Sequence, residues 1–135
     1  MPQEHSTAKT SVEERLLASI NLIDSAQACA LLCIETDDPE GAIQALVLDN
    51  AIIILMPNGR TMVPLFQFDL ASGRVFDVVL DLLKLRPCRM SNLRLAYWLS
   101  RAHVDFAGPP ADRLGQDDAM IVAAFRRYIE LEHHG

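Results

Sequence analysis

Apolar positions near the N-terminus recur at helical intervals, at Val12, Leu16, Leu17, Ile20 and Ile23. This spacing predicts a first helix that continues as far as Ile23. A second helix is expected to run through Cys33, with Asp24 or Ser25 as its N-cap. A third is expected from Asp38-Pro39, because an aspartate followed by proline is typical of a helix start.

The hydrophobic period changes in the middle of the chain. Ala51–Met56 is a continuous aliphatic run, which favours a strand. Pro57-Asn58-Gly59-Arg60 follows, and Asn-Gly is typical of a two-residue hairpin turn. Thr61–Phe68 is the expected returning strand, in which Pro64 restricts pairing to an edge because proline has no N–H to donate. Asp69–Arg74 is expected to be a loop.

Helical spacing returns after this loop, at Phe76, Val79, Leu80 and Leu83, and Pro87 is expected to end that helix. Ser91 is a suitable cap for the next one. Residues 109–115 indicate one helical turn closed by glycine, and an amphipathic helix is expected from Asp117 to Leu131.

The predicted order of elements indicates a mainly α, α+β fold. Three helices and a β-hairpin in that order are typical of a winged helix-turn-helix, and a small C-terminal helical bundle follows. We therefore expect a disordered N-terminus over residues 1–11 and a winged helix-turn-helix-like part over 12–73. We expect a helical part over residues 74–131 and a tail over residues 132–135.

Composition narrows the class of protein. Half of the 135 residues are hydrophobic, which suits a packed core. No apolar run approaches the ~20 residues that a membrane span needs, and no signal sequence is recognised, so a cytoplasmic protein without membrane contact is expected. The net charge is −6, with three basic and ten acidic residues in 1–73 against nine and eight in 74–135.

Candidate catalytic and metal-binding residues are few. His103 and Asp105 have the spacing of a general base and its orienting carboxylate, but no recognisable pattern places a nucleophile beside them. Cys29 and Cys33 could join His103 as metal ligands; we interpret both thiols as core residues, because they lie in an apolar run. The sequence therefore predicts a non-enzymatic protein without metal or cofactor.

One stretch of the sequence points to a family. Pro64, Phe66, Gln67, Phe68 and Asp69, followed by Gly73, match a proline–aromatic–glutamine–aromatic–aspartate pattern. Further along come Trp98-Leu99, and then a loop with Phe106, Gly108, Pro110, Asp112 and Leu114. Over about residues 24–131 the chain resembles antitoxins with the toxin-binding domain of the Xre/MbcA/ParS type. It departs from the family where His103 lies near the position of an asparagine and where Arg113 replaces a leucine.

The resemblance implies an antitoxin that neutralises a cognate toxin of the NAD-consuming RES class. Its binding residues would be Trp98, Leu99, His103, Phe106, Gly108, Pro110 and Asp112. Trp98 can be read as an exposed interface anchor or as a core residue. Gln67, between two phenylalanines, is expected to satisfy backbone groups inside the core. A homodimer is expected as well, because the run Ile52–Leu55 needs to be covered.

The alternative function is transcriptional regulation by direct DNA binding. The third helix should then carry cations, but Pro39–Asp49 has neither lysine nor arginine. Gln44 is its only long polar side chain able to reach base edges, and Arg60 is the single cation at the hairpin tip. We therefore expect weak DNA binding or none.

Overall fold

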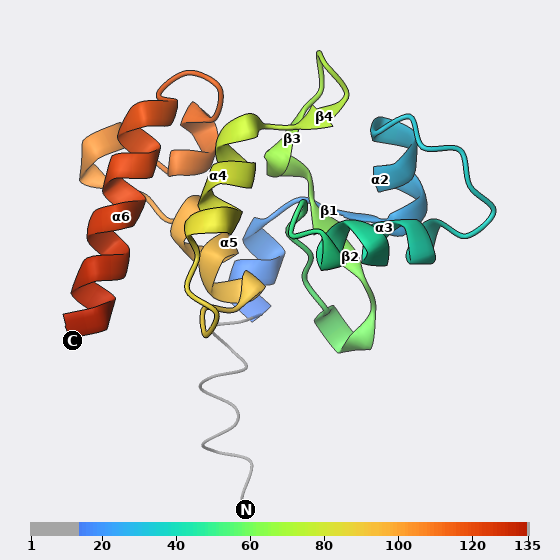
Figure 1. Cartoon of the computed structure of the whole chain (residues 1–135), viewed down its shortest axis with the longest axis horizontal. Coiled ribbons are helices and arrows are strands. Elements are labelled where there is room, and N and C mark those ends of the chain that lie inside the picture. Colours follow the sequence, from blue (N-terminus) through green and yellow to red (C-terminus); the bar gives the residue numbers. More distant parts are fainter. Residues whose placement is uncertain (1–13, 135) are drawn as a thin grey trace, which may run out of the picture.

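The computed structural model describes residues 14–134, so the N-terminal stretch 1–11 for which disorder is predicted lies outside the described residues. The fold is mainly helical with two small antiparallel sheets, which confirms the predicted fold class (Figure 1). Residues 14–19 are helical. The elements that follow are β1 (Leu22–Asp24), α2 (Ser25–Leu31), α3 (Pro39–Leu48), β2 (Met62–Pro64), β3 (Phe68–Asp69), β4 (Arg74–Val75), α4 (Asp77–Leu85), α5 (Asn92–Ser100) and α6 (Asp118–His134).

The predicted helix caps are confirmed. Asp24 and Gln27 form a capping box at α2, in which the Gln27 N–H donates to Asp24 Oδ1 over 2.8 Å. Asp38 accepts from the Gly41 N–H over 3.0 Å at the start of α3. Ser91 accepts from an N–H in the first turn of α5. Each of these side chains satisfies a backbone donor that the helix itself leaves unpaired.

The first helix is shorter than predicted, and the expectation that it continues to Ile23 is wrong. Leu22–Asp24 form β1, which pairs antiparallel with β2 in a register that places Ile23 opposite Val63. Asp24 explains the change, because an N-cap residue has extended dihedrals and cannot lie inside a preceding helix. Pro64 lies in a two-stranded sheet and is therefore at an edge, as expected.

The aliphatic run Ala51–Met56 is not a strand, contrary to the prediction. Leu55 alone forms a bridge, to Met62, and the turn between them has positive φ at Asn58 (54°) and Gly59 (76°), as Asn-Gly predicts. The predicted wing is thus a tight turn with one bridging pair. Residues 52–55 are all buried within the chain, so this run supplies no exposed face for self-association.

A second small hairpin occupies the region predicted as a loop. Phe68 pairs with Val75, and Asp69 pairs with Arg74. Gly73 turns the chain with a φ of 69°, and a Cβ there would lie 3.2 Å from the Leu31 carbonyl oxygen at the end of α2. A larger residue at Gly73 would therefore meet both backbone strain and crowding.

The elements form two groups side by side (Figure 1). α4, α5 and α6 lie on one side, and α2, α3 and the β1–β2 sheet lie on the other. One cluster of buried apolar side chains includes residues of both groups, from Ala28 and Ile43 to Leu99 and Phe125. The division at residue 73 stays a prediction.

The helical segment 14–19 packs beside α5. Its Leu16 and Leu17 contact a small cluster formed by Ile20, Leu55 and Ala96. The two groups of elements are also joined by polar contacts of Asn50, whose Nδ2 donates to the Leu83 carbonyl oxygen over 2.9 Å. Among residues 14–134, no helix has the length and apolar character needed to cross a bilayer.

Candidate functional site

The candidate site is the loop of residues 101–117 between α5 and α6. Its first half is closed on itself, because the His103 N–H donates to the Gly108 carbonyl oxygen over 2.9 Å. Within this closure, the Phe106 N–H donates to the His103 carbonyl oxygen over 3.0 Å. Ala107 adopts the left-handed conformation with a φ of 52°, which completes the reversal of the chain. The loop conformation is therefore fixed by backbone hydrogen bonds.

Aromatic side chains of α5 and α6 pack against the loop on its buried side. Trp98 is only 6% exposed and contacts Phe125 edge to face, with ring centroids 5.1 Å apart. The His103 ring lies 5.3 Å from Phe106 and 6.3 Å from Trp98. Trp98 is therefore a core residue, and the alternative interpretation, an exposed interface anchor, is wrong. Trp98 positions the loop and does not present a surface to a partner.

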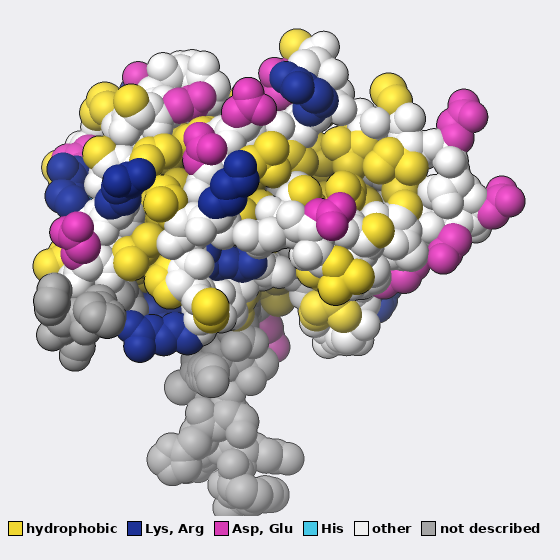
Figure 2. All heavy atoms as spheres, in the orientation of Figure 1, with side chains coloured by type: hydrophobic (Ala, Val, Ile, Leu, Met, Phe, Trp, Pro, Cys, Tyr) yellow, Lys and Arg dark blue, Asp and Glu magenta, His cyan; other side chains and the backbone are white. Residues whose placement is uncertain are grey.

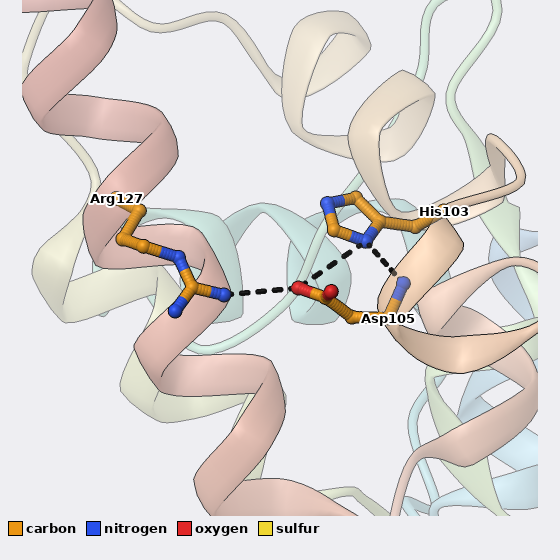
Figure 3. Close-up of polar contacts among 3 residues, drawn as sticks. All are labelled: His103, Asp105 and Arg127. Carbon is orange, nitrogen blue, oxygen red and sulfur yellow. Dashed lines mark hydrogen bonds and ion pairs between the residues drawn. The ribbon is translucent and has the colours of Figure 1, made fainter.

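A polar contact fastens the loop to α6. Arg127 Nη2 donates to Asp105 Oδ2 over 2.9 Å, and the Asp105 N–H donates to His103 Nδ1 over 3.2 Å (Figure 3). Since Nδ1 accepts, a neutral His103 carries its proton on Nε2. Asp105 Oδ2 lies 3.7 Å from that nitrogen. Within residues 14–134, the polar contacts of the His103 ring are with Asp105, and together with Arg127 they fasten the loop to α6.

The seven residues expected to bind toxin lie in or under this loop, but only some are accessible. Leu99, Phe106 and Pro110 are buried together with Trp98, whereas Asp112 is exposed. His103 and Gly108 are partly exposed. Among the large hydrophobic side chains of the described residues, Val104 is the most accessible, at 92% exposed, and the sequence pattern did not indicate it. The exposure of Val104 could not be predicted from its residue type, because valine is commonly buried. The loop closure that exposes this side chain is not visible in the sequence.

The glutamine of the family pattern has the structural role predicted for it. Gln67 is fully buried; its Oε1 accepts from the Ile53 N–H and its Nε2 donates to the Ile53 carbonyl oxygen, each over 2.8 Å. Nε2 also donates to the Pro64 carbonyl oxygen over 3.0 Å. The flanking Phe68 is buried and Phe66 is half-buried. The Gln67 side chain therefore makes the hydrogen bonds to the Ile53 backbone that a neighbouring strand would otherwise make.

Gln44 and Arg60, the candidate DNA contacts, lie near each other but differ in availability. Arg60 is exposed at the turn. Gln44 is half-buried, and its Nε2 lies 3.4 Å from both Glu40 Oε1 and Thr61 Oγ1. Reading a base edge would require Gln44 to leave these contacts.

Glu40 is the centre of that polar group. Its Oε1 accepts from Thr61 over 2.5 Å and its Oε2 accepts from Ser25 over 3.0 Å, so it joins α3 to α2 and to the turn. The hydrogen bond from Thr61, followed by the one from Ser25, lowers the pKa of Glu40 below its ordinary value of 4.5. Both bonds favour the charged form.

We expect the Glu40 carboxylate to make the stability of the folded chain depend on pH in the acidic range. A carboxyl group whose pKa is lower in the folded chain stabilises it above the unfolded-state pKa, and that contribution is lost as pH falls through the folded-state pKa. Glu40→Gln should therefore flatten the fall in urea midpoint between about pH 5 and pH 3. Parallel curves for wild type and variant would contradict this; Glu35→Gln, at an exposed position, is the control.

The cysteines give no support to a metal site. Cys29 is buried, as interpreted, and burial raises the pKa of its thiol. Cys33 is exposed, so its assignment to the core is wrong: it follows the end of α2 with a φ of 59° and turns away from the core. Within residues 14–134, no three His, Cys, Asp or Glu side chains converge as metal ligands.

No family model, curated protein or solved structure matches this chain.

Proposed function

We propose that this chain is a cytoplasmic antitoxin of a type II toxin–antitoxin system that binds a cognate RES-type toxin through the loop 103–112. The observation that carries the proposal is Val104, an almost fully exposed apolar side chain on a loop of fixed conformation. A surface that is already ordered loses little conformational entropy on binding, so its contacts contribute more to affinity. The resemblance of residues 64–73 and 98–114 to antitoxins supplies the partner class.

The neutralisation that we propose is steric and needs no catalytic group. The loop would insert Val104 into an apolar hollow of the toxin and exclude the toxin's substrate. Around the tip, the Asp105 charge is compensated by Arg127, so its desolvation on binding would cost less than that of an isolated carboxylate. A homodimer remains a prediction of this proposal, although the aliphatic run Ile52–Leu55 no longer gives a reason for it.

Val104→Asp is expected to weaken toxin binding by about tenfold to a hundredfold, the effect of losing a central apolar contact and burying a charge. Leu48→Asp is the matched control, because Leu48 is 87% exposed but lies on α3, away from the loop. Titration calorimetry with an inactivated RES-type toxin encoded by the neighbouring gene measures both. Co-expression with the active toxin should restore growth for wild type and Leu48→Asp and fail for Val104→Asp.

Two results would contradict this placement of the interface. One is rescue of growth by a chain ending at residue 73. The other is equal loss of affinity for Val104→Asp and Leu48→Asp.

Direct DNA binding is the second candidate, and the pair α2–α3 with the exposed Arg60 is what favours it. Acidic side chains, however, gather at the end of the molecule where the α2–α3 loop lies, with Asp37 and Asp38 both exposed (Figure 2). These carboxylates would repel phosphates, and one cation at the turn releases too few counterions for tight binding.

We expect no sub-micromolar affinity for duplex DNA at ~150 mM salt. Fluorescence anisotropy with the chain's own promoter fragment, alongside a scrambled fragment, checks this. Sequence-selective binding that is lost on Arg60→Ala or Gln44→Ala would make regulation the leading function.

A further inference from the structure

Ser100, the last residue of α5, has a buried hydroxyl without a partner. Among the described residues, its Oγ is the one buried side-chain nitrogen or oxygen that makes no hydrogen bond. Buried polar groups are nearly always hydrogen-bonded, so an unpaired hydroxyl at this position is unusual and needs a physical reason. Its position offers one, because Ser100 lies where two clefts meet.

The two clefts share Ser19 and Ser100 and together form what we call the Ser100 groove. One cleft, of about 380 Å³, is lined also by Arg15, Leu16, Tyr97 and Arg101. The other, of about 270 Å³, is lined also by Ile20, Asn21, Leu65, Phe66, Pro109, Ala111 and Asp112. The groove thus runs between the helical segment 14–19 and the end of α5, as far as the turn after Pro109.

One end of the groove is cationic. Arg15 and Arg101 are both exposed, and the Arg101 guanidinium lies over the Tyr97 ring at 5.7 Å. Neither arginine forms an ion pair with a carboxylate of residues 14–134. In a chain of net charge −6, two arginines at one cleft without a carboxylate partner among the described residues favour an anionic group there.

The other end of the groove is largely apolar. Leu65, Phe66 and Ala111 are half-buried, so each keeps surface that a bound group can cover. Asp112 is exposed at the rim. A free anion would use only the arginine end and leave this apolar surface in water, so the lining fits a longer ligand of mixed character.

We propose that the Ser100 groove binds an extended acidic segment of a partner protein. A carboxylate of that segment pairs with Arg15 and Arg101, and a neighbouring apolar side chain covers Leu65 and Phe66. A backbone group hydrogen-bonds to Ser100 Oγ once the Ser100 side chain rotates toward the groove, since this oxygen is buried in the free chain. Val104 does not line this groove, although Pro109, Ala111 and Asp112 of the loop 103–112 do, and the proposal does not depend on the partner being a toxin.

The probe is a set of fluorescein-labelled synthetic nonapeptides that combine one glutamate with one leucine at every spacing in a Gly-Ser background. Each is titrated by fluorescence anisotropy with the full-length chain. We expect at least one spacing to bind, and its Glu→Gln version to bind at least tenfold more weakly. Arg101→Glu and Arg15→Glu should have the same effect, whereas Arg126→Glu, an exposed change on α6, should have none.

Ser100→Ala separates a ligand role from a structural one. Because Oγ has no partner in the free chain, its removal should leave the urea midpoint unchanged or raised, yet weaken the bound peptide by threefold or more. Val104→Asp should leave peptide binding intact, so failure of the antitoxin proposal is distinguishable from failure of this one.

The proposal is overturned if no peptide of the set binds, or if binding survives Arg101→Glu. It is also overturned if the arginine variants dissociate a dimer in light scattering, because a second copy of the chain would then be the occupant. The same holds if removal of residues 2–11 is required before any peptide binds.

Discussion

Gln67→Leu is expected to destabilise the chain by about 4 kcal/mol, because buried donors and acceptors left unsatisfied cost ~1–3 kcal/mol each. The substitution removes the Oε1 that accepts from the Ile53 N–H, and also the Nε2 that donates to the carbonyl oxygens of Ile53 and Pro64. Leucine adds apolar volume, which offsets a part of this loss. The total stability of a domain is ~5–15 kcal/mol, so much of it would be lost. Urea denaturation followed by circular dichroism measures the change.

Gln67→Glu is the matched variant, since it keeps the shape and replaces the amide donor by an acceptor. At neutral pH its carboxylate would face the two carbonyl oxygens in a buried site, which raises its pKa in the folded chain. The protonated form can donate one hydrogen bond again, so the variant should be more stable relative to wild type at about pH 4 than at about pH 7. A loss below 1 kcal/mol for Gln67→Leu, or a pH-independent difference for Gln67→Glu, would contradict this role of Gln67.

Trp98→Ala is expected to cost about 3–5 kcal/mol, the range for removing a large aromatic side chain from a core. Trp98 packs against Phe125 of α6 and lies under His103, so its loss would leave a cavity between α5, α6 and the candidate loop. Chemical denaturation monitored by circular dichroism is the suitable measurement, because Trp98 is the only tryptophan for fluorescence.

Two further variants show whether this effect comes from packing. Trp98→Phe keeps the edge-to-face contact and should lose less than Trp98→Ala. Tyr97→Ala, at the neighbouring position with 39% exposure, should change stability by less than about 1 kcal/mol. Similar losses at positions 97 and 98 would mean that Trp98 is not a core residue.

The candidate site could be predicted only in outline. The order of apolar and turn residues predicts a loop between the last two helices, and the family pattern points to Trp98 and Phe106 in and beside it. The pattern could not reveal that the loop closes through the pairing of His103 with Gly108, or that Arg127 reaches Asp105 across 22 residues. Exposure of Val104 results from that closure, so it could be known only from the folded chain.

The sequence by itself determined the features that depend on neighbours a few residues away. Asp24, Asp38 and Ser91 cap helices because a short side chain reaches the backbone N–H three residues later. Asn58-Gly59 turns the chain because both residues tolerate positive φ. These interactions are local, and the residue types alone specify them.

Only the tertiary structure decided what depends on distant partners. Ile53 has the residue type of a strand, yet its hydrogen bonds go to the side chain of Gln67, 14 residues away. Leu22–Asp24 have helical spacing with the residues before them, but they pair with Met62–Pro64 and form a sheet. An apolar residue gains similar free energy from burial in a helix, a strand or an extended segment, so its backbone conformation is set by the partner that the fold supplies for its N–H and C=O groups.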